Sequence, residues 1–145
     1  MTLEDTLTHA SKLFSPSGLE VEFLIAQRGS GEQAVLPTAL GVNAQALTNL
    51  GMLADHPVAM DVLGMRVHAP RPEAYVLHKG IINARRSTKG EKDRQAILSL
   101  LPHLHGPMLR QVFASLTRKQ QAAALQTLEA LGAAAYKTIE SLGTP

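Results

Sequence analysis

The chain has 145 residues, of which 45% are hydrophobic and 18% are charged, an ordinary balance for one folded domain. Its formal net charge of +2 is too small to indicate a nucleic-acid binder from charge alone. No cysteine is present, which excludes disulfides, thiolate zinc sites and cysteine nucleophiles. The sequence also shows no signal peptide and no apolar run of about 20 residues, which predicts a cytoplasmic protein without a membrane span.

The first half of the chain predicts mostly strands. Apolar residues at helical spacing predict a short helix over 3–14, which the break at Ser15–Gly18 ends. Alternating residues predict a strand over 19–26. The segment 34–42 is ambiguous, and Pro37 excludes a central strand position there. The remaining expected elements are a loop at 27–32, a segment at 45–54 that fits strand or helix and is favoured as a strand, a turn at 55–57, and strands at 58–63 and 65–69.

From Pro70 onward, apolar residues recur at helical spacing. Pro72 and Glu73 suit the start of a first helix, because proline fits the first helical position and an acid fits the positive end of the helix dipole. Capping boxes at 88–91 and 117–120 predict a second helix and a long last helix to about 142, with a short helix at 108–115 between them. Strands followed by helices predict an α+β fold, with a small, mostly antiparallel (mixed) sheet over 1–69 and a helical C-terminal region over 70–145, together one compact unit.

Lys79 and Asp93 are the first candidate site residues. Lys79 shares a polar helix face with Tyr75 and Asn83, and this face is either solvated or directed at a phosphate or a carboxylate. Asp93 lies on the apolar side of the second helix, because Ile97 and Leu100 follow it at four and seven residues. A carboxylate there is expected to pair with Lys79, Arg85 or Arg86 or to face a site, and a first-turn acid favoured by the helix dipole is the alternative.

Glu20 and Glu22 form the second candidate group. They lie two residues apart on one face of a predicted strand, so their carboxylates could share a cation. Paired carboxylates are a common element of two-metal phosphoryl-transfer sites. The alternative is the water-exposed face of a half-buried sheet.

Five segments share the pattern of a known family. They are SPSGLEVEFLIA (15–26), LPTALGVNAQAL (36–47), VHAPRPEAYVLHK (67–79), ARR (84–86) and KDRQA (92–96). Together they resemble a bacterial family with the nucleotidyltransferase fold, within the polymerase-beta-like superfamily, over residues 15–102. The resemblance implies a mixed sheet with a helical C-terminal part, and three carboxylates that hold Mg²⁺ around a nucleoside triphosphate.

The resemblance also implies roles for individual residues. Glu22 falls where the third carboxylate is expected, so Glu22 and Asp93 are the catalytic candidates and Glu20 with Glu22 the metal candidates. The cations expected to contact the nucleotide are Lys79, Arg85, Arg86 and Lys92, and Asp93 is expected to orient one of them. The Asp-x-Asp pair that supplies the other two carboxylates in the family does not occur in this sequence. We therefore expect a truncated or degenerate relative, or one that completes its site with another chain.

Three functions follow as expectations. The leading one is a nucleotidyltransferase-like protein that is catalytically incomplete alone and that, if active, transfers a nucleoside monophosphate from ATP or GTP to an acceptor. The second is a non-catalytic interaction module, in which a homodimer or a partner chain completes the sheet, with residues 117–142 as a dimer surface. The third is nucleic-acid binding through the basic turn at 85–94.

Overall fold

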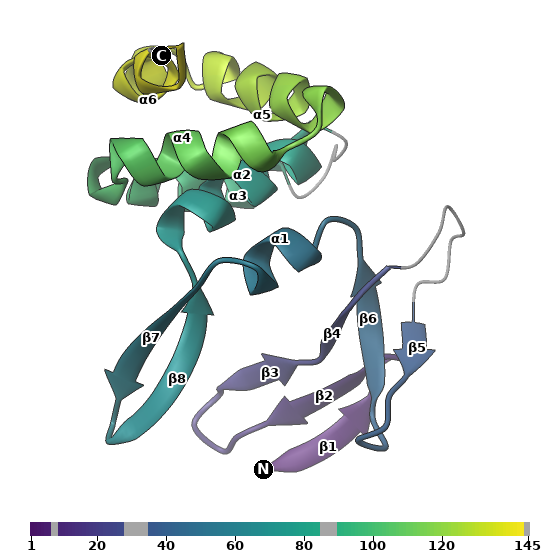
Figure 1. Ribbon diagram of the computed structural model, residues 1–145. Coiled ribbons are helices and arrows are strands. Elements are labelled where there is room, and N and C mark those ends of the chain that lie inside the picture. The colour runs from purple at the N-terminus through teal and green to yellow at the C-terminus, as the bar shows by residue number, and fades with distance from the viewer. Residues whose placement is uncertain (7–8, 28–34, 85–89, 144–145) are drawn as a thin grey trace. The chain divides into compact units, whose positions relative to one another are not determined.

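The computed structural model describes residues 1–6, 9–27, 35–84 and 90–143. The chain divides into two compact units, Met1–Gly51 and Met52–Pro145, which we call the strand unit and the helical unit. Figure 1 shows that strands come first and helices follow, which confirms the predicted α+β fold with small antiparallel and mixed sheets. Strand β8 ends at Pro70 and helix α2 begins at Pro72, close to the predicted change at residue 69. The expected assembly into one compact unit stays a prediction.

The strand unit begins with a three-stranded antiparallel sheet. Its strands are β1 (Thr2–Asp5), β2 (Ser11–Phe14) and β3 (Glu20–Glu22), in the order β1-β2-β3. The registers align an apolar row, Leu3–Leu13–Val21, and a charged row, Glu4–Lys12–Glu22. Because neighbouring strand residues point to opposite faces, these rows lie on the two sides of the sheet.

The predicted helix over 3–14 is therefore wrong. Its apolar spacing fits a helix, but pairing of β2 with β3 selects the two-residue period of a strand. The chain also turns at His9, which has φ of +62°, a left-handed conformation that an α-helix does not accept. The break predicted at Ser15–Gly18 is confirmed, with the Gly18 amide donating to the Ser15 carbonyl and Gly18 at φ of +85°.

A second small sheet completes the strand unit. Its strands are β4 (Leu24–Ala26), β5 (Val35–Pro37) and β6 (Asn43–Leu47), in the order β4-β6-β5, with β4 and β6 parallel and β5 antiparallel to β6. Pro37 lies in the outer strand β5, as its missing N–H requires. The strand predicted over 45–54 is half right, because β6 ends at Leu47 and the short helix α1 (Gly51–Ala54) follows.

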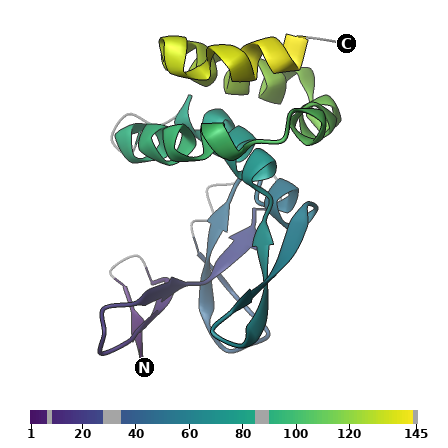
Figure 2. The same ribbon diagram turned by 90° about the vertical axis from the view of Figure 1, so that its left-hand side faces the viewer.

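The helical unit opens with a hairpin of β7 (Pro57–Val62) and β8 (Met65–Pro70), which Figure 2 shows as a two-stranded ribbon. Both strands were predicted to within one residue at each end, and the predicted turn at 55–57 is a bend at Asp55 and His56, because Pro57 already begins β7. Leu63 and Gly64 join the strands with φ of +50° and +78°, as a two-residue type I′ turn requires.

Five α-helices follow the hairpin in the part of the chain that the structure describes. They are α2 (Pro72–Asn83), α3 (Gly90–Leu100), α4 (Gly106–Ser115), α5 (Arg118–Ala130) and α6 (Tyr136–Gly143), with short 3-10 turns at Leu101–His103 and Gly132–Ala135. Pro72 occupies the first turn of α2 as predicted. The capping box at Thr117 is confirmed, since Thr117 accepts from the Gln120 amide and Gln120 accepts from the Thr117 amide. The capping box predicted at 88–91 lies partly outside the described residues.

The long last helix predicted to about residue 142 is wrong, because it is two helices. Gly132 has φ of +63°, and a left-handed residue directly after a helix is a usual termination signal. The chain then turns through the 3-10 segment, and α6 packs against α4, where the Arg110 guanidinium donates to the Ser141 carbonyl at 3.3 Å. Among the residues that the structure describes, none of the helices has both the length and the apolar character to cross a bilayer.

Helix α2 is the centre of the helical unit. It packs against α3, α4 and α5, and it contributes to both clusters of buried apolar side chains. The first cluster is Ala74, Leu77, Ile81, Leu109, Val112, Leu116 and Ala124, and the second is Val76, Ile97, Leu128 and Ala135. Gly80 permits a close crossing with α5, since a Cβ there would lie 3.3 Å from the Ala124 Cα, and Thr127 donates to the Gly80 carbonyl at 2.7 Å.

Candidate functional site

In the helical unit, Lys79 and Asp93 form an ion pair between α2 and α3. Lys79 Nζ lies 2.8 Å from Asp93 Oδ1, and the Asp93 side chain is only 4% exposed whereas that of Lys79 is 21% exposed. The prediction that Asp93 lies on the buried side of its helix and pairs with a neighbouring cation is thereby confirmed, and Lys79 is that cation. A carboxylate buried to this degree needs such a partner, because its desolvation otherwise costs several kcal/mol.

The polar face of α2 is directed at α3. Lys79 Nζ lies 5.5 Å from the centre of the Tyr75 ring, within the range of a cation–π interaction. One turn further on, Asn83 Nδ2 donates to the Gly90 carbonyl at 2.7 Å. This face therefore joins two helices and holds the Lys79 ammonium in a defined place, while the Lys79 side chain stays partly exposed.

The structure describes only some of the other cations that were predicted to contact phosphates. Lys92 is exposed on α3, next to Asp93 in the chain, and Arg94 is half-buried. Arg85 and Arg86 lie outside the described residues, as does much of the basic turn at 85–94. The structure thus brings Asp93 to Lys79, and the roles of the remaining cations stay predictions.

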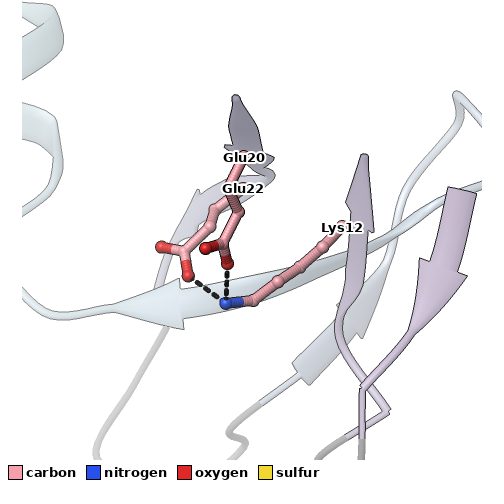
Figure 3. A network of polar contacts seen from close by, with 3 residues as sticks. All are labelled: Lys12, Glu20 and Glu22. Carbon is pink, nitrogen blue, oxygen red and sulfur yellow. Dashed lines mark hydrogen bonds and ion pairs between the residues drawn. The ribbon is translucent and has the colours of Figure 1, made fainter. Parts of the chain in front are cut away.

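In the strand unit, Glu20 and Glu22 share one cation, and it is Lys12. Figure 3 shows the Lys12 ammonium between the two carboxylates, in ion pairs with both. The three side chains are partly exposed, Glu20 at 43% and Glu22 at 53%. The Lys12 ammonium donates hydrogen bonds to Glu20 and, with the next largest effect, to Glu22, and these bonds raise the pKa of Lys12 above its ordinary value of 10.5.

Lys12 was missed in the sequence because 3–14 was predicted to be helical. Once 11–14 is a strand, the turn at Ser15–Gly18 places Lys12 opposite Glu22, and Glu20 on the diagonal. A lysine followed by two glutamates across a predicted hairpin turn is the signal that could have found it.

These residues do not fit a magnesium site. Two carboxylates are the start of one, but the ammonium of Lys12 lies where the ion would have to bind, and Mg²⁺ requires near-ideal octahedral oxygen ligands. Across the described ranges, from 1–6 through 90–143, no group of three or more His, Cys, Asp or Glu side chains could hold a metal ion. Magnesium binding stays a prediction, as does convergence of Glu22 with Lys79 and Asp93 on one pocket.

Buried Glu73 has a structural role that the sequence did not reveal. It is 4% exposed, and its Oε1 accepts the His105 backbone N–H at 2.8 Å. His105 is the residue before α4, so Glu73 at the start of α2 also stabilises the start of α4. The prediction of a helix-dipole acid is compatible with this contact but did not imply it.

The sequence matches a family described as Nucleotidyltransferase over residues 2–118. The chain belongs to this nucleotidyltransferase family. The match spans most of the chain, including the strand unit and helices α2 to α4. A search of curated proteins gave no match.

A solved structure has a similar fold. It is an antigenic nucleotidyltransferase-like protein from Paracoccidioides brasiliensis, with a TM-score of 0.52 and 14% sequence identity. The comparison covers 97% of this chain and 60% of that chain, so this chain corresponds to little more than half of its length. At this identity the likeness shows the fold alone.

Proposed function

We propose that this protein is a nucleotide-binding member of the nucleotidyltransferase family that is catalytically incomplete as a single chain. The observation that carries the proposal is the Lys79–Asp93 pair, which holds an ammonium in place by a 2.8 Å contact while its side chain stays 21% exposed. An ammonium has three donors, so one bond to Asp93 leaves others for a phosphate. Family membership makes a nucleoside triphosphate, ATP or GTP, the ligand class to test.

Transfer of a nucleoside monophosphate requires more than this pair. The in-line displacement needs neutralisation of the charge that develops on the phosphates, which acidic metal ligands and their ions supply in two-metal sites. In the described residues Glu20 and Glu22 are bound by Lys12, and Asp93 is bound by Lys79. We therefore infer that the chain binds a nucleotide and that transfer to an acceptor depends on carboxylates from elsewhere.

Calorimetric titration with ATP and GTP, with and without magnesium, tests the binding. The cleanest variant is Lys92→Ala, because Lys92 is exposed and carries no ion pair in the described structure, so its loss should leave the fold intact. We expect it to weaken binding roughly fivefold, the effect of about 1 kcal/mol from one exposed charge-assisted contact.

Two controls sharpen the result. Lys79→Arg keeps the charge and should retain binding, and Lys137→Ala removes an exposed charge from α6 and should change nothing. No heat of binding for either nucleotide, with or without magnesium, contradicts the proposal. Transfer of label from ATP by the purified chain alone contradicts the inferred incompleteness.

A second candidate function, assembly with another chain, is supported by the strand unit. Several of its large apolar side chains are exposed, with Leu3 at 50%, Leu19 at 58% and Leu40 at 81%. Strand β1 is one of the two outer strands of its sheet, and the free edge of an outer strand can pair with another chain. Apolar residues of 117–142, by contrast, pack within the helical unit, where Ala124 and Leu128 of α5 and Ala135 of the following 3-10 turn are buried.

Light scattering over a range of protein concentrations tests the assembly. We expect the wild type to form a dimer. The Leu3→Lys substitution should raise the dissociation constant of this dimer at least about tenfold, a loss of about 1.4 kcal/mol of binding free energy, because a charge on β1 opposes strand pairing. Leu63→Lys is the matched control, since Leu63 is 95% exposed at the hairpin turn of the helical unit. A strict monomer at high concentration contradicts this candidate.

A further inference from the structure

The three-stranded sheet concentrates charge on one of its faces. Register places Glu4 of β1 and Glu22 of β3 opposite Lys12 of the central strand β2, with Glu20 on the diagonal. Figure 3 shows the Glu20 and Glu22 carboxylates directed at the Lys12 ammonium. Three acids thus share a sheet face with one cation.

Glu20 and Glu22 depend on that cation. Two carboxylates side by side repel one another, and a cation between them removes the repulsion. A divalent ion and an ammonium can both supply the positive charge, but they cannot occupy the same place. The ammonium is covalently attached to β2, so it is always present at high local concentration.

We propose that Lys12 is the permanent cation of Glu20 and Glu22, in the place where a divalent metal ion would otherwise bind, so that this acid pair works without metal. The proposal does not depend on whether the protein binds or transfers nucleotides. It assigns a structural role to two acids whose spacing alone suggests a metal site.

The state of the Lys12 proton agrees with this role. Its pKa lies above the ordinary 10.5, chiefly through Glu20 and then Glu22, so the ammonium is fully charged at neutral pH. A raised pKa in the folded state means that the stabilisation is complete below pH 10.5 and is lost as the pH rises through the folded-state value. Acid pairing by Lys12 therefore persists over the whole physiological range.

Removal of Lys12 should create a metal site. We expect Lys12→Gln to leave the Glu20 and Glu22 carboxylates free to bind Mn²⁺, which serves as a probe for Mg²⁺. Paramagnetic broadening of backbone amide signals in β2 and β3 measures this. The wild type should show no selective broadening there. Lys12→Gln should show it at Mn²⁺ concentrations at least about tenfold below the highest concentration at which the wild type shows none, which corresponds to a gain of about 1.4 kcal/mol in binding free energy.

Charge-matched variants identify the cause. Lys12→Arg keeps a cation between the acids and should behave as the wild type does, and Lys137→Gln removes an equal charge from α6 without effect on β2 and β3. Selective broadening at β2 and β3 in the wild type equal to that in Lys12→Gln overturns the proposal, and so does absence of any gain in a folded Lys12→Gln protein.

A measurement on the wild type keeps the proposal testable if Lys12→Gln does not fold. The side-chain nitrogen signal of Lys12, followed as the pH is raised, should show the ammonium losing its proton above its ordinary pKa of 10.5. Deprotonation of Lys12 at or below that value overturns the proposal. A later deprotonation of Lys12 supports it.

Discussion

Replacement of Lys79 by methionine is expected to lower the free energy of unfolding by about 3 kcal/mol. The substitution removes the ammonium that lies 2.8 Å from Asp93, a carboxylate that is 4% exposed and has little access to water. Loss of one member of a buried ion pair typically costs about 3–5 kcal/mol, and we take the lower end because Lys79 is 21% exposed. Urea unfolding followed by circular dichroism measures the change.

A double substitution separates the pair from its surroundings. Lys79→Met with Asp93→Leu removes both charges and should recover most of the loss, because apolar replacements of a buried pair are often neutral or stabilising. Lys92→Met is the control, an exposed lysine beside Asp93, and should remain within about 0.5 kcal/mol of the wild type. A Lys79→Met protein as stable as this control would show that the pair does not hold α2 to α3.

The helical unit is expected to fold alone, and the strand unit is not. Among the described residues, the large side chains with less than 2% exposure all belong to the helical unit, and they are Val76, Leu77, Ile81, Ile97, Leu109, Val112 and Leu128. The described buried residues of the strand unit are small: Ala10, Ser11, Ala44 and Ala46. A unit of about 50 residues without large buried side chains has too little burial to offset its chain entropy.

Two measurements test this difference. A fragment of residues 52–145 should give a helical circular dichroism spectrum and cooperative unfolding, whereas a fragment of residues 1–51 should give the spectrum of an unfolded chain. In the intact protein, amides of β2 and β6 should exchange with solvent at least about 100-fold faster than those of α2. This ratio corresponds to a free energy of opening that is lower by about 2.8 kcal/mol. A well-dispersed amide spectrum from fragment 1–51 is the result that contradicts the expectation.

The elements that the sequence predicts correctly are those decided by local chemistry. Gly64 permits the turn between β7 and β8, Pro72 suits the first turn of α2, and Thr117 caps α5 through Gln120. Each of these residues acts within a few positions of itself, so no distant contact is needed to predict its effect. Asp93 was predictable for a related reason, since the apolar stripe of its own helix showed that it would be buried and need a cation.

The failures in the strand unit come from contacts that span more than one helical turn. Leu3 and Phe14 fit a helix by spacing, but pairing of β1 with β2 and of β2 with β3 makes this segment two strands. Lys12 could not be connected to Glu20 and Glu22 while it was assigned to a helix. In the predicted last helix, Gly132 was compatible with a helix interior, whereas in the structure it is left-handed and α6 packs against α4.

The small buried side chains of the strand unit affect how this protein can change over generations. Substitutions of exposed residues in β1 to β3 are expected to change stability little, whereas a substitution along α2 disturbs two clusters of buried apolar side chains. Selection for a new ligand or partner can therefore retain substitutions in the strand unit while the helical unit keeps the protein folded. Evolutionary novelty in this chain is expected to accumulate in the strands.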